Sequence, residues 1–216
     1  MFTDDKLKSF VPPSKEKAKQ KDKTFLPTPK ENKETKRVFN DTDTLFWCYY
    51  EMKYGIGSYD LIEKKTIVTE KQMKIALVER LRDATLLHKF AALTHVESKL
   101  ANDRTIDVPT FLTLCVLDEL NVVFINKRSF YELILNSDRP IHYVCKLDYK
   151  YGMDFSVNLD EIRATFYKMD NIDKPIRAVS AYKLDELVDM HQRISGGNDS
   201  VKKKKADLYE AIVKCL

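Results

Sequence analysis

The sequence predicts an α+β protein, mainly α-helical with a small antiparallel β-meander, an extended N-terminal arm and a C-terminal two-helix motif. Three observations lead to this prediction. Apolar residues recur at helical spacing through much of residues 45–120, β-rich runs follow between 122 and 144, and lysine and proline are dense before residue 38. The 216 residues, 44% of them hydrophobic, can bury one core of ordinary size. We therefore expect an arm (1–37), a globular α+β domain (38–175) and the C-terminal motif (176–216).

Residues 1–37 contain ten Lys and one Arg against six acidic residues, so the net charge of +4 for the whole chain originates there. This composition cannot bury enough apolar surface to offset the entropy of ordering, so we expect an extended basic arm. Small apolar islands interrupt the arm, and they suggest docking points for a protein partner. A flexible solubilising tail is the alternative. The candidate docking residues are Phe10, Val11, Phe25 and Leu26.

The first helix is predicted from the capping residues of 41–44, which precede the aromatic run Leu45–Tyr50, with Gly55 as a stop. Its aromatic side chains indicate a place in the core, or else a stacking surface. Apolar spacing and caps predict further helices over 69–90, near 95–100, over 111–120 and over 160–169.

Three β-rich runs follow the helix that ends near Leu120, and they predict the meander. They are residues 122–125, 129–134 and 141–144, with 126–128 as a turn. The same order of helices and hairpin also suits a winged helix, in which Lys127 and Arg128 would form the tip of the wing.

Two amphipathic helices are predicted near the C-terminus, the first over 182–194 with Ser180 as its cap, and the second from Lys204. A polar link of residues 195–199 separates them. Positive charge at the start of the second helix opposes the helix dipole, so an anionic partner such as phosphate explains it better than helix stability does. A solvated charge run is the alternative. The candidate phosphate-binding residues are Lys202, Lys203, Lys204 and Lys205.

The C-terminal pattern resembles a known motif. Tyr182-Lys183-Leu184-x-x-Leu187, the glycine link, and Lys203-Lys204-Lys205-Ala206-x-Leu208-Tyr209-x-x-Ile212 are similar to a SAP-type helix-loop-helix. That motif is associated with DNA binding in eukaryotic chromatin proteins. The resemblance implies contact with DNA through residues 180–215.

The central block also resembles a family. Residues 43–50, the run Phe111-Leu112-x-Leu114-Cys115 and Tyr131-Glu132-Leu133 are similar to an uncharacterised protein family of nucleocytoplasmic large DNA viruses. The resemblance implies a viral protein made in a cytoplasmic virus factory of the host and packaged in the virion. The N-terminal arm has no place in that family's pattern.

No catalytic motif is present. The chain lacks phosphate-cradling glycine loops, a nucleophile elbow and a His-Glu-x-x-His pair, and acidic pairs such as Asp118-Glu119 are typical of solvated helix faces. The four cysteines and four histidines are dispersed, so we expect buried thiols in a reducing compartment, with no metal and no disulfide. We expect no enzyme activity, cofactor or small-molecule substrate.

No apolar run approaches the roughly 20 residues that a bilayer crossing needs, so no membrane-spanning segment is expected. Together these features predict a virion structural protein, a minor capsid component that binds neighbouring capsid proteins through its body and arm. The alternative is a sequence-tolerant DNA-binding protein that acts through the C-terminal motif and the basic arm.

Overall fold

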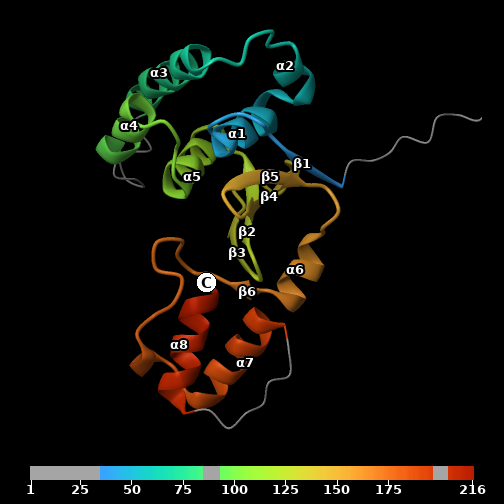
Figure 1. Cartoon of the computed structure of the whole chain (residues 1–216), viewed down its shortest axis with the longest axis vertical. Helices are drawn as coiled ribbons and strands as arrows, with labels where there is room; N and C mark the ends of the chain where they lie inside the picture. Colours follow the sequence, from blue (N-terminus) through green and yellow to red (C-terminus); the bar gives the residue numbers. More distant parts are fainter. Residues whose placement is uncertain (1–34, 85–92, 197–203) are drawn as a thin grey trace, which may run out of the picture. The chain divides into compact units, whose positions relative to one another are not determined.

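The computed structural model of the chain describes residues 35–84, 93–196 and 204–216. All described residues belong to one compact unit, Glu34–Leu216. Figure 1 shows that helices and strands are mixed along this unit. The α+β fold class is confirmed.

The helices of the described residues begin and end close to the capping signals. Asp43 and Asp107 accept hydrogen bonds from Phe46 N–H and Thr110 N–H, and so cap the first and fifth helices. The helices are α1 (Thr44–Tyr54), α2 (Ile56–Asp60), α3 (Ile67–Asp83), α4 (Leu93–Asn102), α5 (Val108–Leu117), α6 (Leu159–Thr165), α7 (Leu184–Ser195) and α8 (Lys205–Cys215), with a 3₁₀ turn at Val179–Ala181. The part of the predicted 69–90 helix beyond residue 84 lies outside the described residues.

The strands form one six-stranded mixed sheet in the order β1-β5-β4-β2-β3-β6. Strands β2 and β3 form the predicted antiparallel hairpin. Three strands were not predicted: β1, which begins inside the expected arm, β5, and β6, which follows α6 where we predicted continuing helix. The strands are β1 (Lys36–Val38), β2 (Asn121–Asn126), β3 (Ser129–Leu133), β4 (Ile141–Leu147), β5 (Lys150–Asp154) and β6 (Tyr167–Lys168).

The predicted antiparallel meander is wrong in one strand, because β4 pairs with β2 in parallel and not with β3. The link between β3 and β4 crosses the start of β2, where the buried Asn121 holds it. The Asn121 amide donates to the carbonyls of Asn136 (2.5 Å) and Arg139 (2.9 Å), and its oxygen accepts from Leu135 N–H. These bonds carry the chain across β2, so β4 lies on the opposite side of β2 from β3.

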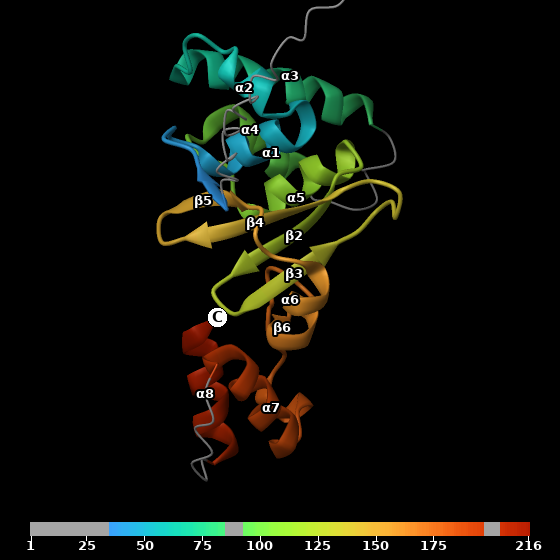
Figure 2. The same ribbon diagram turned by 90° about the vertical axis from the view of Figure 1, so that its right-hand side faces the viewer.

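The two faces of the sheet pack against different helices. Alternate residues Val122, Phe124 and Val144 belong to the main core with α1 and α5, whereas Val123 and Cys145 pack with α6 on the other face. Figures 1 and 2 show α1–α5 on one side of the strands and α6 on the other. The fold is therefore layered, with the sheet between two helical groups.

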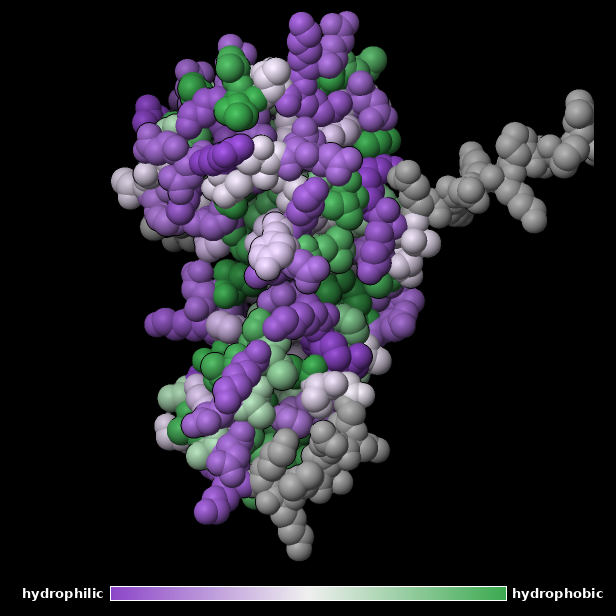
Figure 3. All heavy atoms as spheres, in the orientation of Figure 1, coloured by the Kyte–Doolittle hydropathy of each residue, from purple (hydrophilic) through white to green (hydrophobic). Residues whose placement is uncertain are grey.

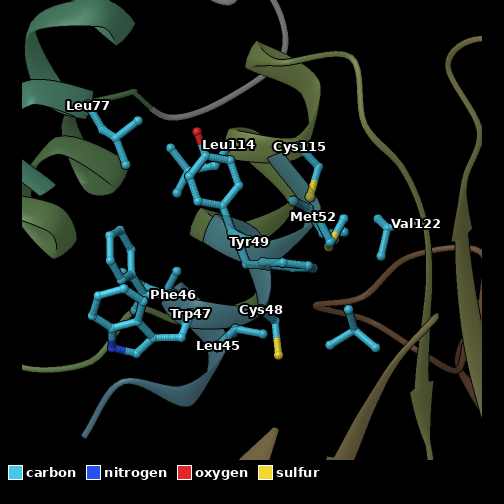
Figure 4. Packing of buried hydrophobic residues seen from close by; sticks show 14 of the residues in the cluster. Leu45, Phe46, Trp47, Cys48, Tyr49, Met52, Leu77, Leu114, Cys115 and Val122 are labelled. Carbon is cyan, nitrogen blue, oxygen red and sulfur yellow. The ribbon is translucent and has the colours of Figure 1, made fainter. Parts of the chain in front are cut away.

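The main core is centred on α1. Trp47 and Cys48 are fully buried, and Leu45, Phe46 and Tyr49 are each 1% exposed, as Figure 4 shows for their packing against α5 and β2. Residues 45–49 of the aromatic run are therefore core packing, whereas Tyr50 is half-buried on the side of α1 that it shares with the exposed Tyr54.

A buried lysine joins α1 to α3. Lys74 is 1% exposed, and its ammonium group lies 2.6 Å from Asp43 Oδ2 and 2.8 Å from Glu70 Oε1 and donates to the Arg104 carbonyl. Trp47 Nε1–H donates to the other Glu70 oxygen at 3.1 Å. The two carboxylates share the one ammonium group and accept further hydrogen bonds from N–H groups, which lowers the cost of burying these charges.

Candidate phosphate-binding site in the C-terminal helix pair

The C-terminal helices α7 and α8 pack on one another around a small core of their own. Leu187, Ile194, Leu208 and Ile212 are buried between them. Leu187 and Ile194 are seven residues apart in α7, and Leu208 and Ile212 are four apart in α8, so each helix presents one apolar stripe to the other. The two predicted helices are present, with their starts shifted by one or two residues.

The start of α7 is neutralised by its own residues. Lys183 N–H donates to the Glu186 carboxylate at 2.6 Å, and Asp185 also lies in the first turn. Carboxylates at this end complement the partial positive charge of the helix N-terminus. We therefore expect no affinity of the α7 start for an external anion.

The start of α8 differs. Lys204 is the N-cap and makes no side-chain cap, and Lys205 follows as the first helical residue. Lys204 is exposed and Lys205 half-buried, and Asp207 is the one acid in the first turn. Backbone N–H groups without a side-chain acceptor and two ammonium groups therefore gather at one place, which suits a phosphate. The candidate residues Lys202 and Lys203 lie outside the described residues.

The opposite ends of both helices are held by the β2–β3 turn. Lys127 Nζ donates to the Cys215 carbonyl at 3.2 Å, and Asn126 donates to the Leu216 carbonyl at 2.8 Å. Arg128 Nε donates to the Arg193 carbonyl at 2.9 Å, at the end of α7. Cations at helix C-termini complement the dipole.

These contacts rule out the winged-helix interpretation of the turn, because the cations of its tip are used inside the molecule. Lys127 has a φ of 52°, in the left-handed region that non-glycine residues rarely adopt. At Gly196, where φ is 70°, a Cβ would lie 3.0 Å from Arg128 Nε. A glycine here permits both the helix end and the close approach of the guanidinium group.

Arg177 also lies beside α8. The exposed Arg177 has its guanidinium group 5.8 Å from the ring of Tyr182, while its carbonyl accepts from the Tyr209 hydroxyl at 2.9 Å. Tyr209 is four residues after Lys205, on the same face of α8. Arg177 was not a candidate in the sequence, because its place beside α8 depends on this tertiary contact.

The candidate docking residues of the arm, Phe10, Val11, Phe25 and Leu26, lie outside the described residues. The described residues offer a different apolar surface. Ile67, Val68 and Ile75 of α3 are 63%, 66% and 47% exposed. Val68 and Ile75 are two turns apart and share one face of the helix. In the upper part of the molecule, where Figure 1 places α3, Figure 3 shows mostly hydrophilic side chains with apolar ones between them.

Of the acidic pair at 118–119, Glu119 is exposed as expected, with 63% of its side chain accessible, but Asp118 is largely buried. Asp118 accepts a hydrogen bond from Tyr49 and pairs with Lys53 (2.9 Å) and Arg80 (2.5 Å). Burial alone would raise the pKa of Asp118, but hydrogen bonds from these three side chains lower it. An ionised carboxylate with three donors serves to join α1, α3 and α5.

The described part of the chain contains no group of three or more His, Cys, Asp or Glu side chains that could hold a metal ion. Within the same residues no helix is long and apolar enough to cross a bilayer. Cys48, Cys115 and Cys145 are buried free thiols. Burial raises the pKa of Cys48 and of Cys115 well above the usual value, so both remain protonated.

In comparisons with known proteins, the chain matches no protein-family model, no curated protein and no solved structure.

Proposed function

We propose that the chain is a non-enzymatic structural protein of a large DNA virus, a minor capsid component located in the virion and in the host's cytoplasmic virus factory. Its body and N-terminal arm bind neighbouring virion proteins, and its C-terminal helix pair contacts viral DNA through the phosphates. The viral origin is supported by the resemblance of residues 43–50 and of the later runs to a family of large DNA viruses.

One observation supports the DNA contact above the others. The start of α8 combines backbone N–H groups that have no side-chain cap with Lys204 and Lys205, whereas the start of α7 is closed by Glu186. Such a site binds phosphate by charge and backbone donors, so it reads no base sequence. The far ends of both helices are held to the β2–β3 turn, which leaves the α8 start as the basic end of the pair.

The exposed apolar face of α3 supports binding to other proteins. Val68 and Ile75 carry large apolar side chains that are 66% and 47% exposed. Exposed apolar side chains that gather on one face are typical of protein–protein contact surfaces.

Salt-dependent DNA binding tests the C-terminal site. Log affinity should fall against log salt concentration, and Lys204→Gln with Lys205→Gln should flatten the slope by about 1.8, since each neutralised phosphate contributes about 0.9. Replacing all four lysines at 202–205 should flatten it by about two to four. Two duplexes of unrelated sequence should give the same slope.

The control for this experiment is Lys64→Gln with Lys150→Gln, which removes the same charge from exposed positions away from α8. This variant should keep the original slope within the error of the measurement. Equal flattening in both double variants would show that only net charge matters, and would contradict a site at α8.

Detection in particles tests the structural role. The protein should remain in purified virions after nuclease and high-salt washes, because protein–protein contacts hold it. Changing Phe10, Val11, Phe25 and Leu26 to Ser should abolish incorporation while the melting temperature of the isolated protein stays within about 2 °C. Absence of the chain from virions would refute the capsid role, and loss of incorporation on lysine neutralisation alone would favour attachment through DNA.

A further inference from the structure

A cavity of about 330 Å³ lies beside the sheet, and its lining does not include Lys204 or Lys205 at the start of α8. Its lining comes from the start of α5, from strands β2, β4 and β5, from residues 169–175 and from Leu216. A volume near 300 Å³ is at the lower end of the range for small-molecule sites.

The floor of the cavity is a row of side chains on one face of the sheet. Asn126 lies opposite Lys146 in the β2–β4 ladder, and Lys146 lies opposite Tyr151 in the β4–β5 ladder. Residues that face each other on adjacent strands project to the same side. Phe124 is two residues before Asn126 and therefore belongs to this side, which is the one that α1 and α5 cover.

The cavity wall is mostly apolar and partly aromatic. The rings of Phe124 and Tyr151 lie 6.0 Å apart, centroid to centroid. The other apolar lining residues are Val108, Pro109, Met169, Ile172, Pro175 and Leu216. A flat apolar molecule fits such a wall better than a strongly hydrated one.

Asp107 and Asn126 of the lining already have hydrogen-bond partners, whereas two other polar side chains do not have one within the described residues. Asp107 accepts from Thr110 N–H and contacts His95, and the Asn126 amide donates to the Leu216 carbonyl. Within residues 35–84, 93–196 and 204–216, the Lys146 ammonium and the Tyr151 hydroxyl make no hydrogen bond or ion pair.

Lys146 and Tyr151 can both donate hydrogen bonds, so they favour a ligand that carries a negatively charged acceptor. Burial raises the pKa of Tyr151, so its hydroxyl keeps the proton and can donate. Asp107 is already engaged by Thr110, His95 and Lys99, so Lys146 and Asp173 are the charges left in the lining. The single Lys146 ammonium can pair with one acidic group, whereas further negative charges on a ligand would be repelled by Asp173.

We propose that this cavity binds a small, flat, mostly apolar monoanion, whose acidic group pairs with Lys146 and whose ring lies against Phe124 and Tyr151. The proposal concerns binding without turnover and does not depend on the DNA contact. The sequence predicted no small-molecule substrate, and the proposed molecule is a ligand that is bound and not converted.

A pair of dyes with one skeleton tests the proposal on the full chain. 8-Anilinonaphthalene-1-sulfonate carries the acid, and N-phenyl-1-naphthylamine lacks it. In fluorescence titrations both should bind one per chain, and Lys146→Gln should weaken the sulfonate about tenfold, as expected for loss of a charge-assisted hydrogen bond. The same change should leave the affinity of the neutral amine within about twofold.

Two further variants distinguish dye binding in the cavity from non-specific adsorption of the dyes to the protein surface. Lys150→Gln removes an exposed charge from β5 outside the lining and should leave both affinities unchanged. Ile172→Phe fills the cavity and should weaken both dyes about tenfold or more, in a chain whose melting curve confirms folding. Binding of several dyes per chain, or a sulfonate affinity unchanged in either Lys146→Gln or Ile172→Phe, would overturn the proposal.

Discussion

Replacing Lys74 by methionine would leave two buried carboxylates without their cation. The lysine is 1% exposed and its ammonium lies 2.6 Å from Asp43 and 2.8 Å from Glu70. Methionine keeps most of the volume, so the loss comes from the uncompensated charges and not from a void. Breaking a buried pair in this way costs about 3–5 kcal/mol, a large part of the stability of a typical domain.

Urea unfolding followed by the fluorescence of Trp47 measures the effect, because this is the single tryptophan and it donates to Glu70. With a slope of about 2 kcal/mol per molar urea, the midpoint should fall by about 1.5–2.5 M. The neighbouring Gln72→Met on the exposed side of α3 should change stability by less than about 0.5 kcal/mol. A loss below about 1 kcal/mol for Lys74→Met would refute the assignment of a desolvated ion group.

Two other substitutions test separate contacts. Gly152→Ala places a Cβ 2.6 Å from the Arg37 carbonyl, so β1 must move from β5; we expect a loss of about 1–3 kcal/mol and faster amide exchange in β1, and unchanged exchange would contradict this close approach. Asp118→Asn should destabilise the chain at pH 7. Because the pKa of Asp118 is lowered in the folded state, its contribution is complete above the unfolded value near 4 and disappears as pH falls through the folded value. Urea midpoints of the two proteins should therefore converge below about pH 4, and a difference that stays constant with pH would contradict the ion-pair role.

The helices were the most predictable elements. Asp43 and Asp107 cap α1 and α5 as their sequence positions predict, and the turn at Lys127–Arg128 separates β2 from β3. These features depend on hydrogen bonds and spacing within a few residues, which a single sequence displays.

The sheet was less predictable. Strand β5 contains Gly152, which weakens a strand signal, yet the glycine is needed because the Arg37 carbonyl of β1 passes so close. The parallel pairing of β4 depends on Asn121. In the sequence this polar residue indicates only the end of a helix, but in the fold it forms hydrogen bonds to the β3–β4 link, 14 to 18 residues later.

The residues of the candidate sites were likewise predictable only where the local sequence determines them. Lysines at the start of α8 were identified from charge and helix position alone, but Arg177, the capping role of Arg128 and the row of Asn126, Lys146 and Tyr151 were not. Each of these depends on a strand or helix partner that the local pattern does not specify.

By itself the sequence determined the α+β class, the approximate starts of all the described α-helices except α2, and the basic charge at residue 204, because capping, apolar spacing and charge act between near neighbours. Tertiary structure decided that Lys74 is a buried ion and not a surface lysine, that the β2–β3 turn holds two helix ends, and that a cavity opens beside Lys146. The physical reason is that desolvation and pairing depend on residues far apart in the chain, which come together only when the sheet and helices pack.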